Sequence, residues 1–423
     1  MKTALETRLA PLFAKEEISL SIESVPARIT VYPKTAEQVC ELVKMAAQDG
    51  ITLLPVGGAT HLYRNGKTLD VAVSLSSLPQ STAHSPPDLT ATLPAGLSFS
   101  RAQESLMHHG QHIPLNPPIE DRSTVGGIIS TDSWGPRRHR YGTARDLVIA
   151  TTLVNATGEM VHAGAKVVKN VSGYDMNKLY IGARGTLGIL LDVSFKLYPE
   201  PEKRVTFSAC FNAAGDAFKL ATEVNRSQLD LEAMTVVKGS WTPGKTRHWW
   251  LLMNLAGPTK GLKPQIDQLQ KLHQRAGARS WKIASESDAQ TFWRTANDSS
   301  TSSSADGDDE EYLARIALPK KNLLRFIAEF SGQYKENLSF KILPGAGICY
   351  LAYSNKFSEQ HEFTSSLIDH IRSFGGSVEF ERLGQDTQER WPILPDSLTW
   401  MRKTKEALDP NGIFAPGTFI DEL

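Results

Sequence analysis

Two helical patterns of apolar residues stand in the first part of the chain. Residues 39–47 carry Val, Leu and Ala at i, i+3, i+4 and i+7, which predicts an amphipathic helix. Thr35 and Gln38 have capping-box spacing before it, and Gly50 stands where a helix-ending residue would. A second helix is expected over 98–109, which ends at a glycine.

Short apolar runs accompany these helices. ITLLPV at 51–56, DVAVSL at 70–75 and DLTATL at 88–93 predict strands. NATGE at 155–159 has the turn chemistry of a hairpin loop, and residues 188–199 predict a long strand ending in prolines. This alternation indicates helices layered against sheets.

The pattern changes after the proline-rich run at 199–203, which predicts a domain boundary. Strands are then expected at 205–211, 247–256 and 312–318, and helices at 214–225, 262–276 and 322–330. Residues 296–311 form a polar, acidic, low-complexity tract, so we expect a surface loop there. Residues 398–417 predict a helix followed by a tail rich in proline and glycine.

One short motif matches a phosphate-binding pattern. GSWTPGKT at 239–246 fits G-x-x-x-x-G-K-[ST], which binds phosphate where a strand precedes it and a helix follows. The following TRHWWLLMN is apolar and aromatic and predicts a strand instead, and Pro243 removes an N–H donor from the loop. We therefore expect a hairpin turn and no nucleoside triphosphate binding. The dinucleotide pattern G-x-G-x-x-G does not occur in the sequence.

Composition narrows the class of protein. The chain has 423 residues, 40% of them hydrophobic and 22% charged, which is enough apolar material for two domain-sized cores. Lys and Arg number 46, as do Asp and Glu, so the formal net charge is zero. Nucleic acids and anionic membranes select for a basic excess. Neither is therefore expected as the main partner.

The cysteines and the longest apolar runs indicate in which cellular compartment the protein functions. Cys40, Cys210 and Cys349 are far apart, which argues against a disulfide framework or an iron–sulfur cluster in this chain and favours a reducing compartment. No signal-peptide pattern follows Met1, and no apolar run approaches the roughly 20 residues that cross a bilayer. We expect a cytoplasmic protein that would reach the inner membrane only through partners, without inserting into it.

Glycine clusters mark the segment from 121 to 201. They are STVGG at 123–127, YGT at 141–143, KNVSGYD at 169–175 and GTLG at 185–188. Glycine is needed where the backbone closes on a ligand or takes a positive φ. This density indicates loops shaped around an extended, phosphate-bearing cofactor. VGGATHL at 56–62, after an apolar strand, is a further loop of this kind.

The order and spacing of these loops, with RDLVIATTLVNATGEMV at 145–161, match one known family. The segment from about Val31 to Pro201 resembles the FAD-binding domain of the vanillyl-alcohol oxidase/p-cresol methylhydroxylase (PCMH) superfamily. The resemblance implies an α+β fold. It would comprise a two-part PCMH-type FAD-binding domain at 1–200, an α+β cap domain at 201–397 with a flexible loop at 296–311, and a segment at 398–423 that returns to the FAD-binding domain.

The resemblance also implies non-covalently bound FAD. Backbone N–H groups of the first glycine loop would form an anion nest for the diphosphate. The expected cofactor-binding residues are Pro55, Gly57, Gly58, Ala59, Thr60, His61, Ser123, Thr124, Gly126, Gly127, Gly142, Gly188 and Ile189. His61 lies in the first loop, but covalently linked relatives place their ligating residue in a different motif. No flavin linkage is therefore expected.

Two features indicate a particular branch of the superfamily. KILPGAGICYLAY at 341–353 stands where D-lactate and D-2-hydroxyglutarate dehydrogenases carry a histidine-containing metal-binding run. It has no histidine or carboxylate, so no metal site is expected. Residues 164–201, WGPRRHRYGTARD at 134–146 and the tail at 400–419 are similar to the FAD-binding subunit of bacterial glycolate oxidase.

This similarity implies a flavoprotein subunit of a multi-component glycolate (2-hydroxyacid) dehydrogenase or oxidase. Such a subunit would take part in oxidising a 2-hydroxy acid to a 2-oxo acid and pass electrons to an iron–sulfur subunit, beside a sister catalytic flavoprotein. Two alternatives stay open. In one, the chain is a structural, assembly subunit whose flavin does not turn over. In the other, it is a self-sufficient FAD-dependent dehydrogenase of another 2-hydroxy acid or an alcohol.

No catalytic base is evident in the sequence. The candidate polar groups near the flavin ring are Arg137, Arg138, Lys169, Asn170 and Tyr174. Clustered Arg137, Arg138 and Arg140 could clamp a substrate carboxylate. Arginines in a glycine-rich loop more commonly balance phosphate charge or contact a partner, and this second interpretation is favoured.

Overall fold

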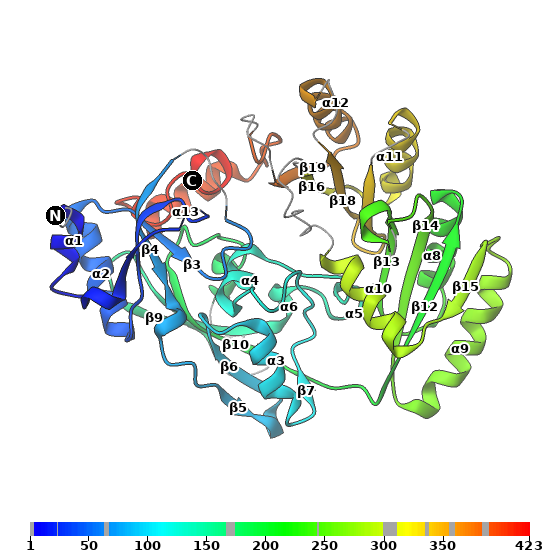
Figure 1. The fold of residues 1–423 in the computed structure, drawn as a ribbon, viewed down its shortest axis with the longest axis horizontal. Coiled ribbons are helices and arrows are strands. Elements are labelled where there is room, and N and C mark those ends of the chain that lie inside the picture. The colour runs from blue at the N-terminus through cyan, green and yellow to red at the C-terminus, as the bar shows by residue number, and fades with distance from the viewer. Residues whose placement is uncertain are drawn as a thin grey trace. The chain divides into compact units, whose positions relative to one another are not determined.

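The computed structural model describes residues 4–22, 24–62, 67–165, 174–242, 245–298, 311–334, 338–354, 360–382 and 389–423. The chain forms two compact units (Figure 1). The first contains residues 1–134, 143–200 and 395–423, and the second contains 135–142 and 201–394. Most of the loop expected at 296–311 lies outside the described residues. No helix in the described part is both long and apolar enough to cross a membrane.

The first unit opens on a four-stranded sheet. Its order is β1-β2-β4-β3, with β2, β4 and β3 parallel. Its strands are β1 (Ile18–Leu20), β2 (Ala27–Val31), β3 (Leu53–Val56) and β4 (Leu69–Ser74). β2 and β3 each pair with β4, and α2 (Ala36–Asp49) lies in the connection from β2 to β3. The helix predicted here is confirmed: the Thr35 hydroxyl accepts from the Gln38 N–H at 3.2 Å, and Gly50 ends the helix at φ 67°.

A five-stranded antiparallel sheet forms the other part of the first unit. Its order is β5-β6-β10-β8-β9. The strands are β5 (Ala83–Ser85), β6 (Thr90–Pro94), β8 (Val148–Val154), β9 (Met160–Gly164) and β10 (Ile189–Lys196). The predicted 155–159 hairpin joins β8 to β9, with Gly158 at φ 73°. β7 (Gln111–His112) pairs separately with β11 (Tyr198–Pro199).

Short helices connect and cover these sheets. The predicted helix at 98–109 is confirmed as α3 (Phe99–Met107), and the tail helix as α13 (Leu398–Leu408). The others in this unit are α1 (Ala4–Leu9), α4 (Val125–Thr131), α6 (Ala144–Leu147) and α7 (Asn177–Tyr180), with 3-10 turns η1 (Lys15–Glu17), η2 (Leu75–Ser77), η3 (Pro86–Asp88) and η6 (Ile420–Glu422).

The second unit is built on one eight-stranded antiparallel sheet. Its order is β15-β12-β14-β13-β17-β18-β16-β19. The strands are β12 (Lys203–Phe211), β13 (Leu231–Lys238), β14 (Trp249–Gly257), β15 (Ser280–Ile283), β16 (Glu311–Ala317), β17 (Ser339–Leu343), β18 (Ile348–Ser354) and β19 (Ser377–Arg382). The strands expected at 205–211, 247–256 and 312–318 are confirmed as β12, β14 and β16.

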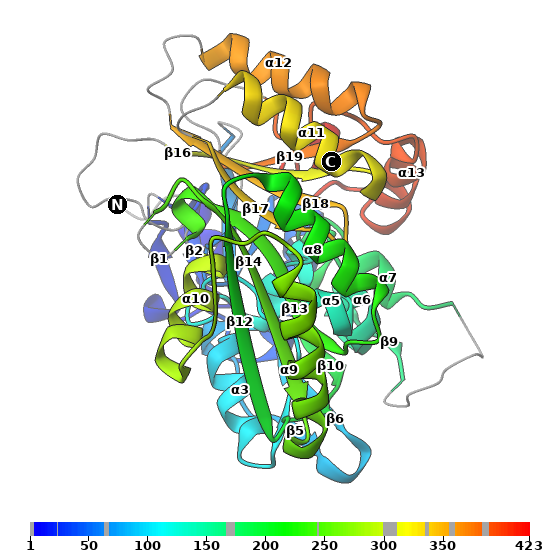
Figure 2. The same cartoon turned by 90° about the vertical axis from the view of Figure 1, so that its right-hand side faces the viewer.

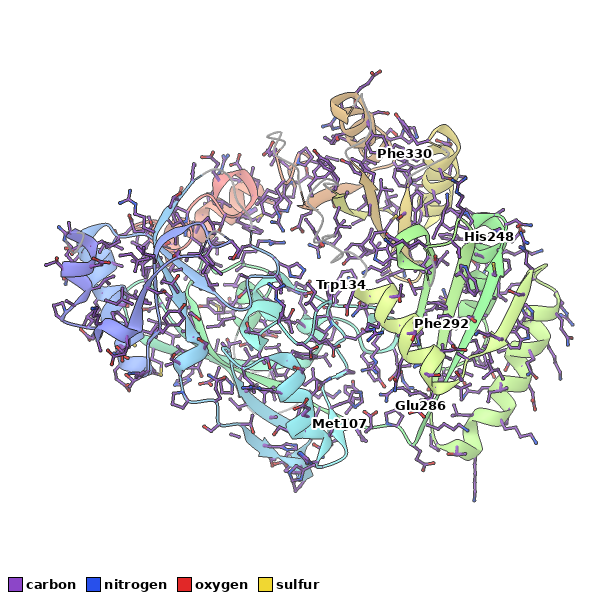
Figure 3. The ribbon with its side chains drawn as sticks, viewed as in Figure 1. Met107, Trp134, His248, Glu286, Phe292 and Phe330 are labelled. Atoms are coloured by element: carbon purple, nitrogen blue, oxygen red, sulfur yellow. The ribbon has the colours of Figure 1, made fainter. Side chains whose placement is uncertain are left out.

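Helices cover one side of this sheet (Figure 2). They are α8 (Ala214–Arg226), α9 (Thr259–Gln274), α11 (Lys320–Gln333) and α12 (Gln360–Ser373), of which α8, α9 and α11 were predicted. Alternate strand residues such as Phe207, Leu251 and Ile342 are fully buried against them, as expected when one face of each strand is covered. Phe330 lies on α11 (Figure 3). Its ring centroid is 5.4 Å from that of Phe363 on α12. α5 (Arg138–Tyr141), α10 (Glu286–Asp298) and η4 (Gly239–Trp241) complete the unit.

Candidate FAD site

The first unit contains a cavity with about 910 Å³ of empty space, counted with its opening to solvent. Ligand sites for small molecules and cofactors commonly have volumes up to about 1,000 Å³. Six segments form the walls: the 54–62 strand and loop, η2, the turn before α3, α4 with the residue before it, the 184–190 loop and the tail. The lining residues are Leu54, Pro55, Val56, Gly57, Gly58, Ala59, Thr60, His61, Leu62, Leu75, Ala95, Gly96, Thr124, Gly126, Gly127, Ser130, Thr131, Arg184, Gly185, Gly188, Leu190 and Thr418.

The first glycine loop follows β3 and packs against the loop before α4. A Cβ on Gly57 would stand 2.1 Å from the Thr124 hydroxyl oxygen, and one on Gly58 would stand 1.6 Å from the Arg122 carbonyl oxygen. Neither glycine has a positive φ, whereas Ala59 has φ 54°. These two glycines are therefore required by the close approach of two loops rather than by a left-handed backbone.

The second wall is the start of α4. The Thr124 hydroxyl caps this helix by accepting from the Gly127 N–H at 3.1 Å. The Gly126 N–H donates to the Ala95 carbonyl at 2.8 Å, and a Cβ on Gly126 would come within 2.8 Å of the Ala95 side chain. Glycine at 126 thus lets α4 meet the turn before α3.

The third wall is the loop between α7 and β10. The Arg184 N–H donates to the Ser130 carbonyl at 2.7 Å, which attaches this loop to α4. Gly185 has φ 78°, and a Cβ there would stand 3.1 Å from the Pro55 ring. Gly188 has φ 149°, and a Cβ there would come within 2.8 Å of Leu153 and the Val154 carbonyl. Replacing Gly185 or Gly188 with any other residue would therefore strain the backbone.

The chemistry of the lining fits FAD. Among the described lining residues, His61 and Arg184 are the titratable ones and none is a carboxylate, so a diphosphate would meet no negative side chain. The glycine loops allow backbone to approach a ligand closely, and Thr60 and Thr124 add hydroxyl donors. Leu54, Leu62, Leu75 and Leu190 provide apolar surface for rings.

Ten of the thirteen residues predicted to bind the cofactor line this cavity. The three that do not are Ser123, Gly142 and Ile189. The Ser123 hydroxyl donates to the Pro118 carbonyl at 3.1 Å, and Ile189 is fully buried within β10. Gly142, with φ 80°, belongs to the second unit.

Sequence reasoning missed several lining residues. Arg184 and Gly185 belong to the GARGTLG run, whose glycines gave a signal that could have included them. Gly96, Ser130 and Thr418 come from three distant segments. No local pattern marks them, because only the fold brings these segments to one cavity.

Comparisons with known proteins also indicate FAD as the cofactor. Residues 27–164 match the family model described as "FAD binding domain", and residues 384–419 match "FAD linked oxidases, C-terminal domain". The solved structure of p-cresol methylhydroxylase with substrate bound superimposes with a TM-score of 0.76 at 15% identity, covering 98% of this chain and 96% of that chain. The fold and the site thus define an FAD-linked oxidoreductase. The chain carries the FAD-binding domain and the C-terminal domain of FAD-linked oxidases, and it shares the fold of p-cresol methylhydroxylase.

Curated relatives give a finer comparison. A D-lactate dehydrogenase of Archaeoglobus fulgidus is 24% identical and covers 93% of this chain and 92% of its own length. Glycolate oxidase subunit GlcD of Bacillus subtilis is 23% identical over 93% of this chain and 89% of its own length. Glycolate oxidase subunit GlcE of Escherichia coli is 30% identical over 39% of this chain and 48% of its own length.

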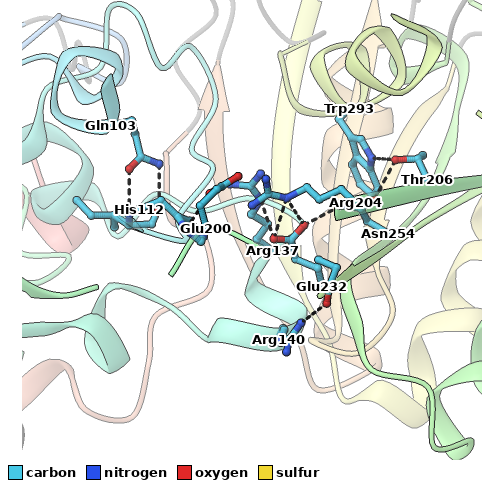
Figure 4. A network of polar contacts seen from close by, with 12 residues as sticks. Gln103, His112, Arg137, Arg140, Glu200, Arg204, Thr206, Glu232, Asn254 and Trp293 are labelled. Atoms are coloured by element: carbon cyan, nitrogen blue, oxygen red, sulfur yellow. Dashed lines mark hydrogen bonds and ion pairs between the residues drawn. The ribbon is translucent and has the colours of Figure 1, made fainter. Parts of the chain in front are cut away.

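Arg137 and Arg140, which were expected to lie near the flavin or to contact another protein, form ion pairs with carboxylates of the second unit. Glu232, on β13, has a fully buried side chain; the Arg204 Nε lies 3.0 Å from it and the Arg137 Nε 3.7 Å (Figure 4). The Asn254 side chain donates to Glu232 at 2.7 Å. Burial raises the pKa of Glu232, but Arg137 and Arg204 outweigh that effect, so the pKa lies below its usual value.

Arg140 is held in the same way. Its guanidinium lies 2.8 Å from the Asp230 carboxylate and donates to the Ala256 carbonyl at 3.0 Å. Neither Arg137 nor Arg140 lines the cavity, and both anchor α5 to the sheet of the second unit. Tyr174 is 95% exposed. Lys169 and Asn170 lie outside the described residues.

The run KILPGAGICYLAY forms β17, a turn and β18. Lys341, Tyr350, Arg315 and Glu379 stand directly opposite one another across four neighbouring strands. Burial lowers the pKa of Lys341 to about 8, and its ammonium lies 4.3 Å from the Tyr350 ring centroid. Across the described ranges, no group of three or more His, Cys, Asp or Glu side chains is placed to hold a metal ion.

The 239–246 motif joins β13 to β14, which pair antiparallel, so the predicted hairpin is confirmed. N–H groups of this motif are used inside the protein: Gly239 donates to the Thr246 carbonyl at 3.0 Å, and Thr246 donates to the Thr242 hydroxyl at 2.7 Å. A phosphate cradle requires such groups to face a ligand. Pro243 lies outside the described residues.

Proposed function

We propose that this chain is the FAD-binding flavoprotein subunit of a multi-component dehydrogenase that oxidises a small 2-hydroxy acid, with glycolate as the foremost candidate. Its partners would be a sister catalytic flavoprotein and an iron–sulfur subunit. The chain would be cytoplasmic and would reach the inner membrane only through these partners. Two relatives named as glycolate oxidase subunits support this assignment.

The observation that carries the proposal is an FAD cavity with little acid–base chemistry of its own. Oxidation of a 2-hydroxy acid to a 2-oxo acid removes two electrons and two protons, and a positioned base assists the proton removal. The described lining has one histidine, His61, and no carboxylate, and the His61 Nδ1 lies 3.0 Å from the Thr60 hydroxyl. A sister subunit that supplies the base would complete the chemistry.

This chain's own residues would bind and orient the cofactor. Backbone N–H groups of residues 57–60 and the hydroxyls of Thr60 and Thr124 would hold the diphosphate, and Arg184 would balance its charge. FAD, when bound, supplies two-electron acceptor chemistry. The electrons would pass onward to the iron–sulfur partner.

A self-sufficient 2-hydroxyacid dehydrogenase is the second candidate. The D-lactate dehydrogenase relative, which matches nearly end to end, favours it. The test is dye reduction with glycolate and D-lactate, by the isolated chain and by the chain co-expressed with the sister flavoprotein and the iron–sulfur subunit. We expect turnover only in the complex. Robust turnover by the isolated chain would instead establish the second candidate.

The same complex separates an electron-carrying flavin from a structural one. Gly58→Ala should remove the flavin because of its clash with the Arg122 carbonyl. Lost turnover with assembly intact would show that this flavin carries electrons. Lost assembly would show that it serves the structure of the complex.

A further inference from the structure

A single lysine in the tail connects two walls of the FAD cavity. Lys405, on α13, places its ammonium 2.7 Å from the Thr186 carbonyl, 2.9 Å from the Phe414 carbonyl and 2.6 Å from the Asp409 carboxylate. An ammonium has three N–H donors, so these three acceptors saturate it. The side chain is only 12% exposed.

The first acceptor belongs to the loop between α7 and β10. Thr186 stands between Gly185 and Gly188, which both line the cavity. Its own hydroxyl donates to the Ala183 carbonyl at 2.7 Å, which tightens the turn that carries Arg184. Lys405 therefore binds the backbone of a loop that lines the cavity, although Lys405 itself is not a lining residue.

The second acceptor belongs to the tail segment that extends the first sheet. The Leu53 N–H donates to the Ile413 carbonyl at 2.7 Å, and the Ala415 N–H donates to the Leu53 carbonyl at 2.7 Å. Residues 413–415 are thus attached to β3, whose Leu54 and Val56 line the cavity. Thr418, a few residues further along the tail, lines it as well.

Asp409 completes the arrangement. Its side chain is fully buried and also accepts from the N–H groups of Ile413 and Phe414, at 3.1 and 2.9 Å. A buried charge is tolerated only when it is paired and hydrogen-bonded, and this pair meets both conditions. Burial lowers the pKa of Lys405, while Asp409 opposes that shift.

We propose that Lys405 and Asp409 are positioning residues for the cofactor: they hold the 184–188 loop and the tail at the separation that FAD binding requires. The pair touches neither FAD nor substrate. The inference rests on the FAD cavity and is independent of the substrate and partners proposed above.

The test uses Lys405→Met in the full chain, with Lys403→Met on the exposed side of the same helix as the matched control. Removing the ammonium leaves two buried carbonyls and a buried carboxylate without their shared donor. We expect the FAD dissociation constant of the apoprotein, measured by quenching of flavin fluorescence, to rise at least about tenfold. Lys403→Met should leave it within about twofold.

A second variant and a second measurement separate positioning from support of the fold. Asp409→Asn keeps an oxygen that accepts from the Phe414 N–H but removes the charge, so it should raise the dissociation constant less than Lys405→Met. Urea unfolding of each apoprotein reports on the fold alone. Unchanged FAD affinity in both variants, with or without lower apoprotein stability, would overturn the proposal. If Lys405→Met does not fold, the Asp409→Asn affinity decides.

Discussion

Gly58 shows how a glycine can serve a cofactor site through the protein's own packing. From the sequence, we interpreted this glycine as required by a closely bound ligand or by a positive φ. The structure gives a different reason, since the Arg122 carbonyl would lie 1.6 Å from a Cβ. Gly58 lines the cavity, and glycine is required there by contact between two loops that are about 65 residues apart in sequence.

This cause makes a graded prediction for substitutions. Gly58→Ala should raise the FAD dissociation constant by more than about tenfold, because a backbone carbonyl cannot move as a flexible side chain can. Gly127→Ala should bind FAD much more nearly as the native chain does, since its Cβ would meet only the Thr124 hydroxyl, at 3.1 Å. Gly215→Ala, with nothing within 4 Å, is the control. Flavin titration of the three apoproteins ranks them, and equal affinities would contradict this account.

Among the helices and strands, the predictions were most accurate where the signals for the start, the buried face and the end of an element all lie within one short stretch of sequence. α2 has its capping box, its apolar stripe and its final glycine within 16 residues. The strands β17, β18 and β19 were not individually predicted. Their polar residues, such as Lys341 and Glu379, are buried beside partners from other strands, so alternation of apolar and polar residues does not mark them.

β13 carries a charge whose effect depends on pH. The pKa of Glu232 is lowered in the folded state, so its stabilising contribution is present above the unfolded pKa of about 4.3 and is lost as pH falls through the folded value. Glu232→Gln leaves Arg137 and Arg204 without their carboxylate. It should cost about 2 kcal/mol near pH 7, and less as the pH falls below about 4.

The measurement is urea unfolding of both proteins from pH 7 to pH 3. The two curves of stability against pH should converge at the acidic end. Asp288→Asn is a suitable control, since Asp288 pairs with Lys282 at 2.7 Å at the surface of the same unit and surface pairs contribute little. Parallel curves for native and Glu232→Gln would mean that Glu232 does not contribute to acid sensitivity.

For the whole molecule, the structure assigns one segment to a different unit from the one that the sequence indicated. Residues 135–142 were expected within the FAD-binding domain, yet they lie with the second unit. The reason is electrostatic, because Arg137 and Arg140 find Glu232 and Asp230 about 90 residues further along the chain. Charge partners at such separations leave no local pattern.

Whether FAD is bound covalently or non-covalently is tested on the whole protein. We predict that acid or heat releases all of the FAD intact into the supernatant, because the glycine loops of the cavity would bind it through backbone contacts. His61→Ala is the informative variant: it should retain FAD at near-native stoichiometry. Absorbance spectra of supernatant and pellet provide the measurement, and flavin remaining with the precipitated protein would show a covalent link.

The sequence by itself determined the local elements and the glycine loops, because helical period, capping and turn chemistry act over a few residues. The class of cofactor was implied by the resemblance of these loops to those of a known family. The tertiary structure decided which residues share the cavity. Arg184, Gly96 and Thr418 line it and Gly142 does not, and Lys405 finds its acceptors at Thr186 and Phe414. Such contacts depend on hydrogen bonds and ion pairs between distant segments, which exist only once the sheets have set those segments side by side.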